Sequence, residues 1–167
     1  QGRLEVERKA VIDNAAFDFG TGTTLFHGDL TVRNADGEFG DNLCVEGMLS
    51  LEDSSILVTG GFYGGGITAV KKQDGENLTY EELNLEGGKV FAERGVKGVI
   101  FAENYKLNVQ SGILERSDDR IPFITGTGIL EMGGEEYKIE ELTESMFESE
   151  ETETGWVLTG IVQEQKK

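Results

Sequence analysis

Short stretches in which apolar and polar residues alternate run along most of the chain. In residues 43–51, Leu43, Val45, Leu49 and Leu51 fall on one face, as in a β-strand with one buried side. Residues 4–12 and 23–32 alternate less regularly. Further strand-like runs are residues 55–59, 67–72, 78–85, 90–93, 99–114, 121–130, 137–142 and 156–162. The pattern predicts an all-β protein.

Helical and turn signals support the same class. No sustained i, i+3, i+4 stripe is present, although residues 76–85 could form one or two turns and residues 140–149 are ambiguous. The chain has 24 glycines and one proline, and Asp36-Gly37 and residues 73–76 are typical of turns. Strands about ten residues apart are typical of a sandwich or a barrel. A barrel has no open strand edge, so we expect a single antiparallel barrel with an internal cavity.

One weak internal similarity is present. Val45 and Val109 occupy matching positions in two similar segments, and Thr59 and Thr125 match at nearly the same separation. Two copies are fewer than the three that a solenoid needs. They fit successive hairpins of one barrel, with chance similarity as the alternative.

Charge and composition limit the classes of binding partner and the cellular compartments that fit the chain. With 32 acidic and 15 basic residues the net charge is −17, which disfavours binding to nucleic acid and to anionic membranes. No apolar run reaches the length of a membrane span, and the acidic residues 148–153 are expected in a solvated loop. The single cysteine, Cys44, fits a cytoplasmic protein, with secretion after removal of a signal segment as the alternative. Gln1-Gly2 is typical of a protease-tag remnant, which leaves residues 3–167 as one domain.

Several turn motifs resemble a known family. Residues 37–40 with Val45 and Gly47, and residues 52–61 with their Thr-Gly-Gly ending, are similar to the core segment of plant allene oxide cyclases. Residues 124–133 resemble a glycine turn shared with dirigent proteins, and residues 156–160 resemble the last strand of bacterial spirotetronate-type [4+2] cyclases. The resemblance covers residues 23–162.

The resemblance implies an eight-stranded, calycin-like β-barrel with an apolar pocket. Members of this family act without a cofactor, by holding a flexible polyene or polyketide-like substrate in one reactive conformation. The implied function is therefore a cofactor-independent cyclase or isomerase, of Diels–Alderase type, in natural-product biosynthesis. A hydrophobic small molecule is the expected partner, neither cofactor nor metal is expected, and assembly into a homo-oligomer is left open.

Aromatic residues are the best candidates for the pocket. Tyr105, Tyr137 and Trp156 each combine an apolar ring with a hydrogen-bond donor and are the candidate catalytic residues. The candidate substrate-binding residues are Phe26, Phe101, Phe123 and Gln110. His27 is the only histidine, so a histidine-rich metal centre is excluded.

Three functions stay open on the sequence alone. The first is the cyclase, the second is a non-catalytic, lipocalin-like carrier of a hydrophobic molecule, and the third is a structural or surface-assembly β-protein. An aromatic-lined cavity would favour the first two. A core filled by side chains and an exposed apolar edge strand would favour the third.

Overall fold

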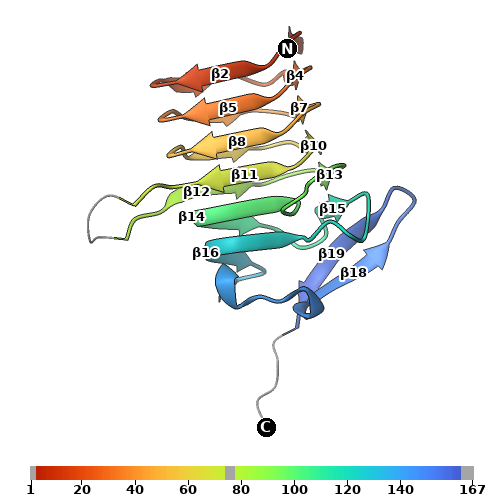
Figure 1. The fold of residues 1–167 in the computed structure, drawn as a ribbon. Helices are drawn as coiled ribbons and strands as arrows, with labels where there is room; N and C mark the ends of the chain where they lie inside the picture. The colour runs from red at the N-terminus through yellow and green to blue at the C-terminus, as the bar shows by residue number, and fades with distance from the viewer. Residues whose placement is uncertain (1–2, 74–77, 163–167) are drawn as a thin grey trace.

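The strands stack as the rungs of a parallel β-solenoid (Figure 1). The computed structural model describes residues 3–73 and 78–162. Its six rungs contain β1 (Arg3–Val6), β2 (Ala10–Asp13), β3 (Ala16–Asp18), β4 (Thr23–Phe26), β5 (Leu30–Arg33), β6 (Asp36–Phe39), β7 (Leu43–Val45), β8 (Leu49–Glu52), β9 (Ile56–Val58), β10 (Phe62–Gly64), β11 (Ile67–Val70), β12 (Glu81–Leu85), β13 (Val90–Ala92), β14 (Ile100–Val109), β15 (Leu114–Arg116) and β16 (Ile124–Met132).

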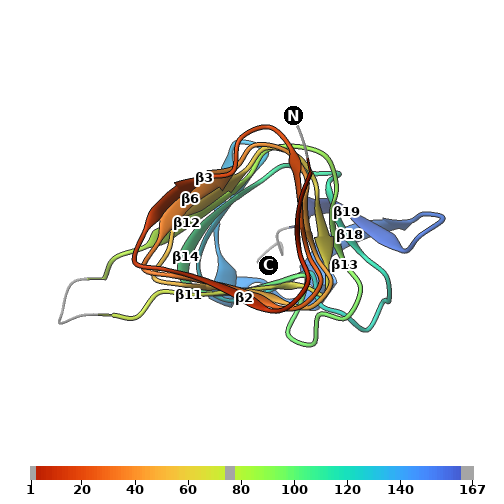
Figure 2. The same ribbon diagram turned by 90° about the horizontal axis from the view of Figure 1, so that it is seen from above.

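The rungs form three faces around the solenoid axis (Figure 2). One face is an eight-stranded sheet in which β1, β4, β7, β10, β13 and β15 follow one another. The other two faces belong to an eleven-stranded sheet, because β14 turns a corner and pairs with β11 in its first half and β12 in its second. All pairings between rungs are parallel, so each face displays residues of successive rungs in straight columns.

The rung repeat is visible in the register of one face. The successive Cα partners there are Ala10, Leu30, Leu49, Ile67, Ile100 and Ile124. The first three steps along this series are nearly equal in length, and the last two are longer. The two long steps contain the extra residues that follow β11, β13 and β15. The underlying unit is therefore about 19 residues, with insertions placed at the corners.

Buried apolar side chains from every face fill the solenoid axis. The third rung alone contributes Leu43, Val45, Leu49, Leu51, Ile56 and Val58, each at most 2% exposed. The opening seen down the axis in Figure 2 is the space that such side chains occupy. The core explains why the strands are short and apolar at alternate positions.

Asparagine and aspartate residues build the corners. Asn14, Asn34, Asp53 and Asn104 have φ between 47° and 58°, in the left-handed region that these residue types tolerate best. The first three directly follow β2, β5 and β8, and the fourth lies within β14 at the bend between its two faces. One corner of the solenoid is thus formed by the same backbone conformation in the first three rungs and in the fifth.

Aspartate and asparagine side chains also form hydrogen bonds from one rung to the next. The Oδ1 atoms of Asp29, Asp36, Asn42 and Asp53 each accept a hydrogen bond, 2.7–2.9 Å long, from a backbone N–H in the following rung. The donors are Met48, Ser55, Gly61 and Lys72. Part of the acidic composition is therefore structural, because the three aspartates among these residues pair with backbone N–H groups at the corners.

The C-terminal end of the solenoid is covered. β17 (Glu135–Lys138) folds back antiparallel on β16, and two 3-10 turns follow, η1 (Ile139–Glu141) and η2 (Glu144–Met146). β18 (Phe147–Glu151) and β19 (Trp156–Ile161) form an antiparallel hairpin whose second strand pairs with β15. Buried Ile139 and Leu158 extend the core into this cap.

The prediction of a single antiparallel eight-stranded barrel is wrong, although the all-β class is confirmed. Alternation of apolar and polar residues reports which side of a strand is buried, and it does not distinguish a hairpin partner from a strand one rung later. Asp36-Gly37 lies within β6 rather than in a hairpin turn. Within the other predicted turn, residues 74–76 lie outside the described residues.

Two smaller predictions are also corrected. Val45 belongs to β7 on one face and Val109 to the end of β14 on another, so the internal similarity does not match equivalent rung positions. Residues 148–151 form most of β18, with exposed side chains, where a loop was expected. The proposed tag remnant, residues 1–2, lies outside the described residues.

Candidate functional site: an outer groove on the eight-stranded sheet

An apolar column lies on the outside of the eight-stranded sheet. Leu25, Cys44, Tyr63 and Phe91 are successive Cα partners in four rungs. Their neighbours along the strands, such as Phe26, Val45 and Phe62, are buried in the core, so strand alternation turns the column outward. Outward positions of a solenoid face are normally polar, so a contiguous apolar column makes this face the candidate site.

The column forms the floor of a groove of about 510 Å³. We call this the outer groove, and its lining is Leu25, Cys44, Val45, Glu46, Tyr63, Gly64, Phe91, Glu93 and Arg94. Tyr63 is 39% exposed, which makes its ring the most accessible apolar surface of the column. A Cβ at Gly64 would lie 2.3 Å from the carbonyl oxygen of Val45, so the close pairing of β10 with β7 requires glycine at this position.

A buried carboxylate closes the C-terminal end of the column. Glu115, the Cα partner of Phe91, is only 4% exposed. Its Oε1 accepts hydrogen bonds from the hydroxyls of Thr152 and Thr154 in the β18–β19 turn, and Lys89 Nζ lies 3.4 Å from its Oε2. Lys89 also lies 5.6 Å from the centre of the Phe91 ring. The charge of Glu115 is thereby paired, and it anchors the hairpin beside the groove.

Carboxylates surround His27 at the N-terminal end. His27 Nε2 lies 2.5 Å from Glu5 Oε2 and 4.0 Å from Glu7 Oε2, and Nδ1 lies 3.2 Å from Glu46 Oε1. The three carboxylates come from the first and third rungs, and the imidazole from the second, so the cluster exists only because the rungs are in register. Glu46 belongs to both the cluster and the groove lining.

The cluster is electrostatically negative even with a charged imidazole. Hydrogen bonding to Glu5, and then to Glu46, raises the pKa of His27 above its usual value. A protonated His27 offsets one of the three surrounding carboxylates. The groove rim therefore carries the exposed acids Glu46 and Glu93 and extends into the exposed acids Glu5 and Glu7.

Glu5, Glu7 and His27 also have atoms of the type that hold a metal ion. One ligand atom from each lies within 4.8 Å of the other two. A neutral imidazole and two carboxylates suit zinc or a similar divalent cation. Both carboxylates are exposed, and the hydrogen bond to Glu5 already engages His27 Nε2, so the arrangement serves as an ion-paired cluster.

Arg94 supplies positive charge on the rim, and its position is fixed. Its guanidinium Nη2 donates a hydrogen bond to the backbone oxygen of Glu46, and its backbone N–H donates to the oxygen of Gly65 over 3.1 Å. Arg94 follows β13 in the fifth rung, so its side chain extends past the fourth rung to reach Glu46 in the third. Arg94 braces the groove wall through a carbonyl and leaves the Glu46 carboxylate facing His27.

The residues predicted from the sequence lie in separate places. Tyr105 is fully buried, and its hydroxyl donates to the oxygen of Ser54 while the Ser54 N–H donates to it over 3.1 Å. Burial raises the pKa of Tyr105 well above its ordinary value, with the hydrogen bond to Ser54 opposing this effect. Ser54 in turn accepts from the N–H of Ala35. Tyr105 therefore satisfies buried backbone groups at a corner of the solenoid.

The other six candidates do not meet Tyr105 or one another in one pocket. Tyr137 lines a pocket of about 460 Å³ beside Tyr80, and Gln110 lines another of about 240 Å³. Phe26 and Phe123 are buried in the core, the latter with the Arg116 guanidinium 3.9 Å from its ring centre. The remaining two lie on different sheets, Phe101 on β14 facing outward and Trp156 on β19 packed against the core. None of the seven lines the outer groove.

Sequence reasoning missed the groove because its residues look like core. Leu25-Phe26, Cys44-Val45 and Phe62-Tyr63 read as continuous apolar stretches, which are typical of strands buried on both sides. The signal that could have revealed the column is the equal spacing of Leu25, Cys44 and Tyr63 along the chain. The same spacing links His27 to Glu46.

Comparison with known proteins adds no relative. No family model matches the chain, and neither a curated protein nor a solved structure matches it. The resemblance to allene oxide cyclases and dirigent proteins is therefore untested by comparison. Among the described residues, no helix is long and apolar enough to cross a membrane. The candidate site consequently rests on the geometry of the outer groove.

Proposed function

We propose that the protein is a non-catalytic binding module whose outer groove holds a basic polypeptide segment with apolar side chains. The observation that carries the proposal is the outward column of Leu25, Cys44, Tyr63 and Phe91 beside exposed carboxylates. A rigid stack of rungs displays this surface without needing a moving part. The ligand then lies along an outer face, and not inside a barrel.

The column supports binding of apolar side chains. Aromatic rings bring large contact areas with few rotatable bonds, so Tyr63 and Phe91 lose little conformational entropy on binding. Strand pairing fixes the backbone of all four column residues on both sides. The groove is thus preorganised, which lowers the cost of association.

The length of the column supports an extended segment. Neighbouring strands of a sheet are about 4.8 Å apart, so the three steps from Leu25 to Phe91 span about 14 Å. An extended polypeptide covers about 3.4 Å per residue, so four or five residues match this span. A segment of this size carries two or three side chains toward the floor of the groove.

The charges support a basic partner. Glu46 and Glu93 are exposed on the rim, Glu5 and Glu7 lie at its N-terminal end, and the whole chain carries a net charge of −17. Such a field attracts cations and repels anions before contact. Arg94 donates to the backbone oxygen of Glu46 and Lys89 pairs with the buried Glu115, while the carboxylates of Glu46 and Glu93 stay exposed. Lysine or arginine between apolar residues therefore complements both parts of the surface.

A peptide titration tests the proposal. The probe is a synthetic peptide of alternating leucine and lysine, followed by calorimetry or by fluorescence of a labelled peptide. We expect saturable binding of this peptide, no binding of a leucine–glutamate peptide, and at least about tenfold weaker binding of a serine–lysine peptide. Equal affinity for the leucine–lysine and serine–lysine peptides would reduce the interaction to charge alone and overturn the proposal.

A matched pair of variants locates the binding site. Phe91 and Phe101 are both half-buried, outward-facing, and close to a lysine, at 5.6 Å from Lys89 and 4.7 Å from Lys97. Phe91 lies in the outer groove and Phe101 on another face. We expect Phe91→Ser to weaken binding of the leucine–lysine peptide about tenfold or more and Phe101→Ser to leave it unchanged. Equal losses in the two variants would place the peptide elsewhere.

A further inference from the structure

We infer that a second binding site lies beside the C-terminal cap and takes a small organic cation, in which an alkylammonium group is joined to an apolar body. The site is the pocket of about 460 Å³ that holds Tyr80 and Tyr137, and we call it the cap pocket. Its floor is on β16, whereas the outer groove lies on the eight-stranded sheet. The inference is therefore independent of the proposed function.

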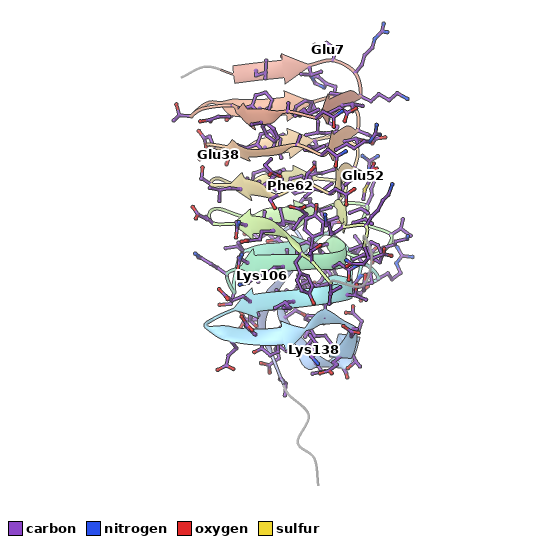
Figure 3. The ribbon with its side chains drawn as sticks, turned by 90° about the vertical axis from the view of Figure 1, so that its left-hand side faces the viewer. Glu7, Glu38, Glu52, Phe62, Lys106 and Lys138 are labelled. Atoms are coloured by element: carbon purple, nitrogen blue, oxygen red, sulfur yellow. The ribbon has the colours of Figure 1, made fainter. Side chains whose placement is uncertain are left out.

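Four adjacent strands carry the cap pocket. Glu82 of β12, Lys106 of β14, Ile129 of β16 and Lys138 of β17 are successive Cα partners. Lys106 and Lys138 are labelled in Figure 3, with Lys138 nearer the covered end of the stack. The three steps between these strands span about 14 Å. A ligand that reaches from the β12 side of the pocket to β17 therefore needs a body longer than a single ammonium group.

Apolar side chains supply the contact area of the pocket. Leu78 and Tyr80, which come just before β12, are 58% and 38% exposed, and Ile129 and Tyr137 are half-buried. Tyr137 also packs against the core, which holds it in place. The face of a tyrosine ring has a negative potential and attracts alkylammonium groups at short range. These four residues therefore suit a ligand that carries a positive charge next to apolar surface.

Carboxylates give the pocket a negative charge. Glu136, Glu140 and Glu141 line it together with one lysine, Lys138, so acids outnumber bases three to one. Within the described residues, none of these three carboxylates has an ion pair or a side-chain hydrogen bond. All three are exposed at the rim, where they attract cations and repel anions. The charge of the pocket thus complements an ammonium group.

Neighbouring ion pairs leave this charge in place. Lys71 Nζ lies 3.3 Å from Glu81 Oε2, and Lys106 Nζ lies 3.9 Å from Glu131 Oε2. Both lysines are therefore engaged by carboxylates that do not line the pocket. The acids of the pocket itself remain available to a ligand.

The size of the pocket distinguishes between two sources of such a cation, a free organic amine and a lysine side chain of another protein. Pockets of roughly 300–1,000 Å³ enclose most of the surface of a small-molecule ligand, and the cap pocket lies within this range. A lysine side chain is a single unbranched chain and fills only part of such a volume. A small molecule with a compact apolar body therefore fits the pocket better.

A ligand-observed NMR titration tests the inference, with benzyltrimethylammonium as the probe. We expect saturable binding, at least about fivefold tighter than that of tetramethylammonium, which lacks the ring, or of benzyl alcohol, which lacks the charge. A glycine peptide with one lysine should bind more weakly than the probe. Absence of saturable binding, or equal affinity for the probe and benzyl alcohol, would overturn the inference. Tighter binding of the lysine peptide would overturn the assignment to a small molecule.

Two tyrosines of almost equal exposure provide matched variants. Tyr80 is 38% exposed in the cap pocket, and Tyr63 is 39% exposed in the outer groove. We expect Tyr80→Ser to weaken binding of benzyltrimethylammonium at least about fivefold and Tyr63→Ser to leave it unchanged. For the leucine–lysine peptide the order is reversed, so failure of one site is distinguishable from failure of the other. Equal losses of probe binding in the two variants would contradict the inference.

A second pair of variants tests the role of charge without touching a ring. Glu140 lines the cap pocket, whereas Glu148 is exposed on β18 and does not line it. Glu140→Gln should weaken binding of benzyltrimethylammonium about twofold to fivefold, and Glu148→Gln should have no effect. Equal effects would attribute the binding to the net charge of the whole chain and would overturn the assignment to the cap pocket.

Discussion

Gly126→Ala should lower the free energy of unfolding by about 3 kcal/mol or more. Gly126 lies in β16 with φ of +116°, a conformation that is almost restricted to glycine. A Cβ at this position would lie 1.7 Å from the backbone oxygen of Ala102 in the rung before. The clash cannot be relieved by a side-chain rotation, because the opposing atom belongs to the paired strand. Urea unfolding followed by circular dichroism measures the loss.

Gly112→Ala is the matched control for this prediction. Gly112 also has positive φ, +85°, but nothing lies within 4 Å of an added Cβ. The substitution therefore has only the conformational cost of about 1–2 kcal/mol. If the two variants unfold at the same urea concentration, the close approach of β14 and β16 at this corner is incorrect.

Tyr105→Phe should lower the free energy of unfolding by about 1–3 kcal/mol. The phenol hydroxyl donates to the oxygen of Ser54 and accepts from its N–H in a corner that is fully buried. Removal of the hydroxyl leaves a buried donor and a buried acceptor without this partner, while the ring keeps its packing. The same urea titration measures the effect, with unchanged slope as the sign that the fold is preserved.

Tyr137→Phe provides the comparison for Tyr105. Tyr137 is half-buried on β17, and its ring is part of a surface pocket. We expect a change within about 0.5 kcal/mol, as for surface substitutions in general. A loss for Tyr137→Phe as large as that for Tyr105→Phe would contradict the structural role assigned to the Tyr105 hydroxyl.

The all-β class was predictable from the sequence because alternation and glycine spacing both report short strands. Leu49 and Leu51 point inward in β8, as the pattern in residues 43–51 predicted. Direction of pairing was not predictable in the same way. A strand whose side chains alternate between inside and outside can pair with a strand reached by a tight turn. It can equally pair with a strand reached after a full circuit of the solenoid.

A repeat signal for the solenoid is present but interrupted. Asn14, Asn34 and Asp53 recur once in each of the first three rungs at nearly equal spacing, and they are the residue types that tolerate the left-handed corner. The step from Ile67 to Ile100 is almost twice as long as the step before it and breaks this rhythm. Glycine turns alone resemble those of other β-proteins, which is how Thr125-Gly-Thr-Gly128 came to resemble a barrel turn while it forms a solenoid corner.

The candidate site depends on which rungs are adjacent, and this could not be read from single strands. Aromatic residues were expected to meet around a cavity, but Tyr105 and Phe123 point into the core and Phe101 points out of it. His27 has carboxylate neighbours only because Glu5, Glu7 and Glu46 come from the adjacent rungs. The ion pairs of His27 therefore depend on the register between adjacent rungs.

The solenoid and its groove both depend on the register between rungs, and the single cysteine permits a direct test of that register. Tyr63 is the Cα partner of Cys44, one rung later, and both side chains face outward into the groove. Tyr63→Cys should be joined to Cys44 within one chain by dibromobimane, a cross-linker that becomes fluorescent only when it bridges two close thiols. Val11→Cys, which is exposed on another face, should give no such fluorescence. Efficient cross-linking in Tyr63→Cys alone confirms the parallel stack, and its absence there would contradict the solenoid and the groove together.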